Sequence, residues 1–229
     1  MSFWKNEKGI LAVVSGFSGA GKGTIVKALM AKYDHYALSV SMTTRNPRDG
    51  EVHGKDYYFV TNDAFRQVID QDGFLEYAYY EGSSNNYGTP RAFVEENLAR
   101  DNHVILEIEV QGRAQVKAVY PEALSIFIVT PTPRDLVRRL EDRPDQSIDF
   151  ATVQKRLRTA LRECADIGRY DAMLINETGK AEACADTIEK IMQTGDVSGY
   201  EPDLTFVEKF KTELEDIIDN REKKGTDAK

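Results

Sequence analysis

The chain contains the run Gly16-Phe17-Ser18-Gly19-Ala20-Gly21-Lys22-Gly23-Thr24, which lies between two apolar segments of different periodicity. The continuous apolar segment 10–14 before the run predicts a buried strand, and the apolar spacing over 25–30 after it predicts a helix. A strand, a glycine-rich turn and a helix in this order are the context of a phosphate-binding P-loop. Glycines allow backbone N–H groups to converge on one anion, and Lys22 adds a mobile positive charge. The run therefore predicts a site for the outer phosphates of a nucleotide.

Segments with strand and helix patterns alternate along much of the chain. The predicted strands are 10–14, 104–110, 124–129 and 173–175, and the predicted helices are 23–33, 91–100 and 112–120. A further helix is expected to begin at Thr132, because Pro133 suits a first helical turn and Asp135 suits the positive end of the helix dipole. The alternation predicts an α/β fold, with a parallel sheet core and helices on both of its faces.

Two segments interrupt this alternation and divide the chain. Residues 40–88 are rich in Tyr, Gly, Arg and Asn, and they predict an inserted β-rich subdomain with short strands near 57–60 and 74–80. Residues 134–166 are crowded with Arg and Asp, and they predict two helices separated by a loop near 144–145. Mobile lids and solvated helical hairpins share this pattern. The P-loop core domain is then expected to consist of 1–39, 89–133 and 167–199.

The C-terminal segment 200–229 predicts a helical extension. Its apolar residues recur with helical spacing on one face, and they are Phe206, Val207, Phe210, Leu214, Ile217 and Ile218. Such a face can pack on the protein's own core or form a contact between two copies. We expect packing on its own domain, with a frayed end over 222–229.

The composition restricts the partners and the compartment. A net charge of −8 argues against general nucleic-acid binding, because a phosphate polymer would be repelled. The apolar runs are too short to span a bilayer, and residues 1–8 lack the apolar core of a signal peptide. Cys164 and Cys184 form no Cys-x-x-Cys motif, which fits a reducing compartment. We expect a cytoplasmic protein that acts on small molecules, with neither a nucleic acid nor a membrane as partner.

A second motif reads Ser39-Val40-Ser41-Met42-Thr43-Thr44-Arg45-Asn46-Pro47-Arg48-Asp49-Gly50-Glu51. Arg45 and Arg48 lie on either side of a proline-stiffened turn, and Tyr57 follows shortly afterwards. Two guanidinium groups and a phenol can hold a phosphate dianion, since each guanidinium matches two of its oxygens. Two arginines in a loop are by themselves usually solvated, so the segment alone fits either a solvated turn or a phosphate clamp.

Together these motifs resemble the guanylate kinase family. The resemblance extends over about residues 9–194, and it includes the segments Phe74-Leu75-Glu76, Tyr87-Gly88-Thr89 and Leu106-Glu107-Ile108-Glu109-Val110-Gln111-Gly112. It implies a core domain, a GMP-binding insertion over 40–88 and a lid over 134–166. It also implies the Mg²⁺-dependent transfer of the γ-phosphoryl group of ATP to GMP or dGMP, with ADP as the other product.

The resemblance assigns roles to individual residues. Lys22 and the amides of loop 16–24 would hold the ATP phosphates, and Asn176 would line the adenine pocket. The residues matched to the GMP phosphate are Arg45, Arg48, Tyr57 and Tyr87, and those matched to the guanine base are Ser41, Glu76, Thr89 and Glu109. The lid arginines that would close on the transferring phosphoryl group are Arg139, Arg143 and Arg156. Glu107 and Glu109 are the candidate metal ligands.

The chemistry of phosphoryl transfer agrees with these assignments. The phosphate of GMP is already ionised at neutral pH, so the reaction needs positioning and positive charge more than a strong base. Guanine presents N1–H and a 2-amino group side by side, and the carboxylate of Glu76 can accept both. Adenine presents an unprotonated N1 at the same place, so a carboxylate would select against it.

The sequence departs from the family pattern at several positions. Glu107 and Glu109 stand where Asp is usual, Phe17 replaces a frequent proline, and Gly23 separates Lys22 from Thr24. The segment 81–86 is longer than usual. In the lid, residues 143–147 replace the more common Arg-Gly-x-acid pattern, and the loop is also longer.

Three alternatives have different functions. Guanylate-kinase-like interaction modules have lost catalysis, but they typically lack the P-loop lysine that this chain keeps. A kinase for another phosphate acceptor on the same scaffold is the second alternative, and Glu76 with Ser41 argues for guanine instead. A regulatory GTPase would need Asn-Lys-x-Asp, which the segment Asn176-Glu177-Thr178-Gly179 does not match.

Overall fold

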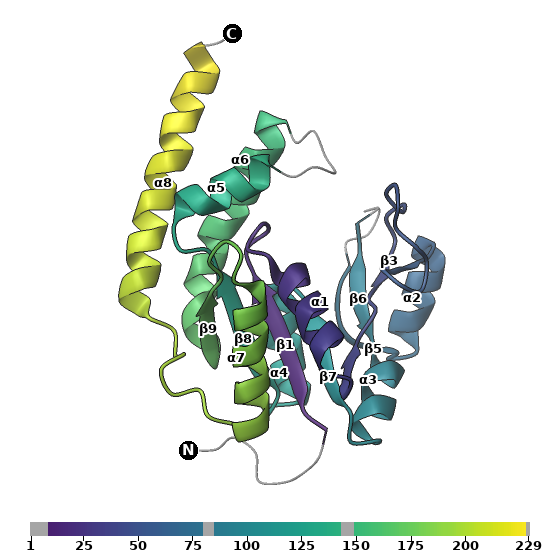
Figure 1. Cartoon of the computed structure of the whole chain (residues 1–229). Coiled ribbons are helices and arrows are strands. Elements are labelled where there is room, and N and C mark those ends of the chain that lie inside the picture. Colours follow the sequence, from purple (N-terminus) through teal and green to yellow (C-terminus); the bar gives the residue numbers. More distant parts are fainter. Residues whose placement is uncertain (1–8, 80–84, 143–148, 228–229) are drawn as a thin grey trace. The chain divides into compact units, whose positions relative to one another are not determined.

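The computed structural model describes residues 9–79, 85–142 and 149–227 of the chain (Figure 1). Its contacts separate the chain into two compact units. One unit contains Val14–Leu29 and Ser125–Lys229, and the other contains Ser2–Val13 and Met30–Leu124. Strand β1 (Leu11–Gly16) crosses from one unit to the other.

A five-stranded sheet has the strand order β2-β7-β1-β8-β9. The other strands are β2 (Tyr36–Leu38), β7 (His103–Glu107), β8 (Leu124–Val129) and β9 (Ala172–Ile175). The pairs β2–β7 and β8–β9 are parallel. All residues of β1 and β8 are buried, as expected for parallel strands covered on both faces. The predicted α/β fold with a parallel sheet core is therefore confirmed.

The unit that contains the P-loop combines the end of β1, most of β8 and all of β9 with a larger set of helices. It includes most of α1 (Lys22–Lys32), together with α5 (Pro133–Glu141), α6 (Phe150–Glu163), the 3₁₀ helix η1 (Cys164–Arg169), α7 (Ala181–Thr194) and α8 (Leu204–Asp227). Thr132 caps α5 as predicted, because its Oγ1 accepts a hydrogen bond from the backbone N–H of Asp135 at 3.1 Å. Helices α5 and α6 flank the predicted lid loop, and residues 143–148 of that loop lie outside the described residues.

Helix α8 packs against α5, α6 and η1 of its own unit, as the sequence predicts (Figure 1). The predicted fraying over 222–229 is wrong in part, because the helix continues to Asp227. Contacts to neighbouring helices hold the helix at the start of this stretch. Arg221 forms an ion pair with Glu141 of α5, and Glu222 accepts a hydrogen bond from Arg158 of α6.

The other unit contains a second sheet with the strand order β4-β3-β6-β5. Its strands are β3 (Met42–Thr43), β4 (Tyr58–Phe59), β5 (Phe74–Ala78) and β6 (Tyr87–Pro90), and its helices are α2 (Asn62–Asp70), α3 (Arg91–Leu98) and α4 (Val110–Val119). The β-rich segment expected over 40–88 thus forms its own sheet. One boundary differs from the prediction: β7 ends at Glu107, and Val110 begins α4, because Glu109 occupies the N-cap position with an extended backbone.

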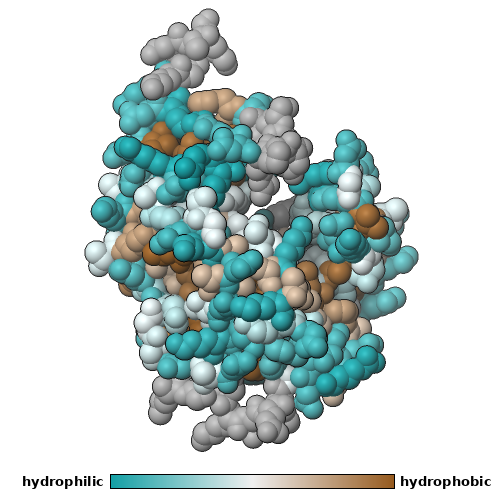
Figure 2. Space-filling view, viewed as in Figure 1, coloured by the Kyte–Doolittle hydropathy of each residue, from teal (hydrophilic) through white to brown (hydrophobic). Residues whose placement is uncertain are grey.

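The surface drawn in Figure 2 is mostly hydrophilic, with small separate apolar patches. Among the described residues, no helix combines the length and apolar character that crossing a membrane requires. Cys164 and Cys184 are both buried and unpaired.

Candidate active site

The backbone of the P-loop run has a positive φ angle at three glycines, Gly16, Gly19 and Gly21. Gly19 and Gly21 have φ angles of +94° and +91°, a conformation that other residues rarely adopt. A Cβ atom at Gly21 would lie 2.5 Å from Nδ2 of Asn176, and one at Gly19 would lie 3.0 Å from a side-chain carbon of Leu140. The loop is therefore closely packed against its neighbours as well as sharply turned.

Lys22 is the first residue of α1, and its ammonium group lies against the loop. Its Nζ donates to the carbonyl oxygen of Gly16 at 2.6 Å and to that of Phe17 at 3.3 Å. The backbone N–H of Ala20 also donates to the carbonyl of Phe17, at 2.9 Å. The sequence thus places a full positive charge, a helix N-terminus and a glycine-rich turn together, as an anion site requires.

Arg139 and Asn176, which the sequence assigned to two different roles, meet at the P-loop. The side-chain Nδ2 of Asn176 donates to the carbonyl of Ala20 at 2.8 Å, and Nη1 of Arg139 donates to the same oxygen at 3.3 Å. Arg139 also donates to the carbonyl of Asn176 at 2.8 Å and to Oγ1 of Thr178 at 3.2 Å. Burial lowers the pKa of Arg139. Asn176 is therefore a support of the loop, and its role in an adenine pocket stays a prediction.

The two remaining lid arginines are Arg143 and Arg156. Arg156 lies half-buried on α6. Arg143 lies outside the described residues. The convergence of three lid arginines on one phosphoryl group therefore stays a prediction.

In the other unit, the predicted phosphate clamp is organised by a residue that the sequence reasoning missed. Both carboxylate oxygens of Glu51 pair with the guanidinium group of Arg45, each at 2.7 Å, and Oε2 also accepts the backbone N–H of Arg48 at 2.8 Å. The hydrogen bond to Arg45 lowers the pKa of Glu51 to about 2, and the same bond raises the pKa of Arg45. In the sequence, only the position of Glu51 at the end of the turn Arg48-Asp49-Gly50-Glu51 could have indicated this role.

Two tyrosines predicted for the same phosphate lie beside Arg45. The guanidinium carbon of Arg45 is 4.9 Å from the centre of the Tyr57 ring, and the Tyr57 and Tyr87 rings are 6.0 Å apart. Burial raises the pKa of Tyr57. Arg48 is exposed on the adjacent turn. The structure therefore brings Arg45, Tyr57 and Tyr87 together, with Arg48 held near by through its backbone contact to Glu51.

Glu76 is a buried carboxylate with a defined orientation. It lies on β5 opposite Thr89 of β6, and Oγ1 of Thr89 donates to its Oε1 at 2.6 Å. Burial raises the pKa of Glu76, and the nearby carboxylate of Glu109 raises it further. Ser41 is half-buried, and its carbonyl accepts the backbone N–H of Tyr58 at 2.9 Å. Glu76 and Thr89 are thus brought together as the sequence predicts.

Helix α4 passes close to the same carboxylate. A Cβ atom at Gly112 would lie 2.4 Å from Oε2 of Glu76, so only glycine fits at this position without moving the carboxylate. The sequence reasoning assigned no role to Gly112, and nothing in the local pattern marks it as a neighbour of a strand far along the chain.

A guanylate kinase family profile matches residues 8–194 of the chain. The chain belongs to the guanylate kinase family. The guanylate kinase of Clostridium acetobutylicum is 46% identical over 173 residues, which cover 76% of this chain and 80% of that protein. The guanylate kinase of Clostridioides difficile is 43% identical over 210 residues, or 91% of this chain and 98% of that protein. The crystal structure of guanylate kinase from Anaplasma phagocytophilum has a TM-score of 0.64 at 30% identity, and it covers 81% of this chain and 85% of that one.

We expect the free energy of unfolding to fall in acid, because the Arg45–Glu51 ion pair is lost when Glu51 is protonated. The pKa of Glu51 lies near 2 in the folded chain and near 4.5 ordinarily, so the pair contributes fully above pH 4.5 and is lost as the pH falls toward 2. Because both side chains are partly solvated, we expect an effect on the order of 1 kcal/mol. Urea unfolding followed by circular dichroism at pH 6 and pH 3 measures it. The Glu51→Gln variant should lose less stability over this range than the wild type, and equal losses would contradict the prediction.

Proposed function

We propose that this protein transfers the γ-phosphoryl group of ATP to GMP, with ADP and GDP as products. The observation that carries the proposal is the buried carboxylate of Glu76, which is oriented by Thr89 in the same unit as the cluster of Arg45, Tyr57 and Tyr87. Such a unit offers an acceptor for guanine and a cationic clamp for a phosphate. The family to which the chain belongs and the relatives named above support the same reaction.

The P-loop is the proposed site of the ATP phosphates. Lys22 would turn from the carbonyls of Gly16 and Phe17 to the phosphate oxygens, which are stronger acceptors because they carry negative charge. Arg139, Arg143 and Arg156 are proposed to add positive charge around the transferring group. Residues 134–166 are proposed as a lid and residues 40–88 as the GMP-binding subdomain, so that closure excludes the water that would otherwise take the phosphoryl group.

Mg²⁺ is proposed as the metal of the reaction. Among the described residues no group of three or more His, Cys, Asp or Glu side chains forms a metal site. Mg²⁺ is commonly held by one or two carboxylates together with substrate phosphates and water, so a complete protein cage is unnecessary. Glu107 and Glu109 are exposed carboxylates near the end of β7 and fit this limited role. The ion would neutralise charge on the ATP phosphates.

A cytoplasmic location and the absence of nucleic-acid partners are part of the proposal. The net charge of −8 and the two buried, unpaired cysteines support both, and all the substrates are small molecules.

A coupled assay of ADP formation tests the proposed function. ATP and Mg²⁺ are supplied with GMP, dGMP, AMP, UMP, CMP or no acceptor. We expect turnover with GMP and dGMP and background rates with the others. Turnover with a different acceptor would keep the kinase reaction but contradict the guanine site. If the folded protein binds ATP but transfers no phosphoryl group to any acceptor, the proposal that it is a kinase is contradicted.

Gly112→Ala is expected to raise KM for GMP about 10-fold or more, because the added Cβ atom would displace the Glu76 carboxylate from the base. KM for ATP should change less than twofold. Alanine is intrinsically a better helix former than glycine, so weakening of α4 is not the expected cause. Gln111→Ala, an exposed position one residue earlier on the same helix, is the matched control. An unchanged KM for GMP in the Gly112 variant would contradict the prediction.

A further inference from the structure

Helix α8 lies beyond residue 194, where the family match ends, and yet it contacts the P-loop directly. The ring of Phe210 stacks on the ring of Phe17, with centroids 5.3 Å apart and an interplanar angle of 20°. Phe17 is completely buried and Phe210 is 3% exposed. Phe17 belongs to the phosphate-binding run itself, so the helix outside the family match packs on a residue of the loop.

Phe17 is held on a second side by the central sheet. Its ring meets Phe127 of β8 edge-on at 5.2 Å, and Phe127 in turn meets Tyr170 at 5.0 Å. Phe17 is therefore enclosed between β8 and α8. Its carbonyl oxygen accepts the backbone N–H of Ala20 and the ammonium group of Lys22. A shift of Phe17 would therefore move the carbonyl to which the Ala20 N–H and the Lys22 ammonium group donate.

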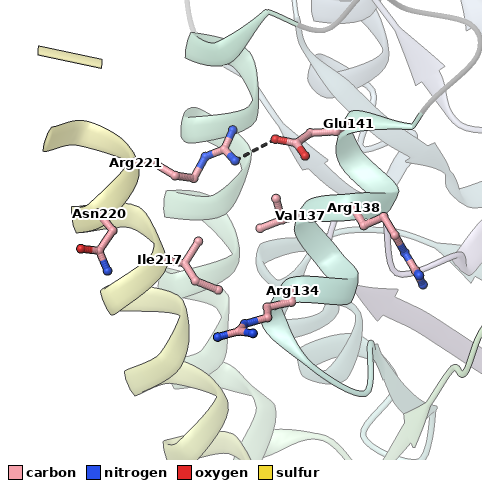
Figure 3. A pocket seen from close by; sticks show the side chains of 7 residues that line it. All are labelled: Arg134, Val137, Arg138, Glu141, Ile217, Asn220 and Arg221. Carbon is pink, nitrogen blue, oxygen red and sulfur yellow. Dashed lines mark ion pairs between the residues drawn. The ribbon is translucent and has the colours of Figure 1, made fainter. Parts of the chain in front are cut away.

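The same helix also contacts both helices that flank the proposed lid loop. Nη1 of Arg221 lies 2.7 Å from a carboxylate oxygen of Glu141 at the end of α5 (Figure 3). Nε of Arg221 donates to Gln154 of α6 at 3.2 Å, and its guanidinium carbon is 5.1 Å from the centre of the Phe150 ring. One side chain of α8 therefore joins α5 to α6.

An open pocket lies between α5 and part of α8. The two helices leave a cavity of about 300 Å³ between them, lined by Arg134, Val137, Arg138, Glu141, Ile217, Asn220 and Arg221 (Figure 3). Phe210 does not line this pocket, and Leu214 and Ile218 are buried further along α8. A substitution at Phe210 can test the contact with the loop separately from the contacts with the lid helices.

We infer that α8 is a positioning element of the ATP site, and that Phe210 holds the P-loop in its binding geometry through Phe17. Phe210 stacks on Phe17, whose carbonyl oxygen accepts the Ala20 N–H and the Lys22 ammonium group, so it acts on these groups through its neighbour. Removing its ring opens one side of Phe17 and allows the loop to relax away from the sheet. The inference rests on the proposed function, because it takes the P-loop to be the ATP site.

The test compares Phe210→Ala with Ile218→Ala. Ile218 is buried on the same face of α8, two turns nearer the C-terminus, and so it controls for the general cost of emptying this face. Titration calorimetry measures Kd for ATP, and steady-state kinetics measures KM for ATP and for GMP. We expect Phe210→Ala to weaken ATP binding at least about fivefold, with KM for GMP changed less than twofold. Ile218→Ala should leave Kd for ATP within twofold of the wild type.

Two outcomes overturn the inference: unchanged ATP affinity in Phe210→Ala, or an equal loss in Ile218→Ala. Phe210→Leu replaces Phe210→Ala if the alanine variant is recovered unfolded, and the same pattern is expected at smaller size. Combining Phe210→Leu with Phe17→Leu gives a further check, because effects that pass through one contact should not add. The wild type is assayed first with GMP, so that failure of the proposed function is recognised before any variant is compared.

Discussion

Arg48→Ala is expected to lower kcat/KM for GMP by about 10²- to 10³-fold, because it removes a charged group that we propose to pair with the substrate phosphate. The fold should survive, since the hydrogen bonds between Arg48 and Glu51 involve the backbone N–H and carbonyl of Arg48, and its side chain is exposed. The KM for ATP should be nearly unchanged. Steady-state kinetics with each substrate varied in turn, together with thermal unfolding, measures these quantities.

Arg45→Ala should combine a similar loss of activity with a loss of stability. Its guanidinium group takes both oxygens of Glu51, so the substitution leaves a partly buried carboxylate without its partner. Lys55→Ala is the matched control, because it removes an exposed positive charge from the same sheet region. A wild-type kcat/KM for GMP in Arg48→Ala, or an equal loss of kcat/KM in Lys55→Ala, would contradict the assignment of Arg45 and Arg48 to the GMP phosphate.

The sequence predicted the elements of the fold that depend on local pattern. The continuous apolar runs of β1 and β8 indicated strands buried on both faces, and both are buried throughout. The cap at Thr132 and the apolar face of the C-terminal helix were also predicted correctly. The boundary at Val110 was not, because the apolar run continues through it while the backbone of Glu109 already caps the next helix.

The sequence named most of the residues that the structure brings together at the candidate site, but few of the contacts between them. Ala20 accepts hydrogen bonds from side chains 119 and 156 positions further along the chain, and no local pattern encodes such a meeting. The stacking of Phe210 on Phe17 is of the same kind. Glu51 was passed over for a different reason. An acidic residue in a polar turn is usually solvated, so only the structure could identify Arg45 as the partner of Glu51.

Glu76→Gln is expected to lower kcat/KM for GMP by about 10³- to 10⁴-fold, because an amide can accept only one of the two N–H groups that guanine presents and directs its own donor at the other. Kd for ATP should change less than twofold. Glu96→Gln, which neutralises an exposed carboxylate on α3, is the matched control. A similar fall in ATP binding would mean that Glu76 supports the fold and not the choice of base.

The pH dependence of GMP use should reveal the same carboxylate. Glu76 must be ionised to accept both guanine donors, and burial raises its pKa above the ordinary value for Glu. KM for GMP should therefore rise as the pH falls through that raised pKa, starting at a higher pH than an exposed glutamate would give. Glu76→Gln removes this titration but keeps that of the substrate phosphate, so the ratio of the two KM profiles isolates Glu76.

Thr89→Val is expected to move the titration of Glu76 to higher pH. The hydroxyl of Thr89 donates to the carboxylate at 2.6 Å and lowers the pKa of Glu76, opposing the effect of burial. Without that donor the pKa of Glu76 should rise further, and the increase in KM for GMP should begin at a higher pH than in the wild type. A profile that does not move in Thr89→Val would show that another group titrates, because no other change in the variant alters the charge of the site.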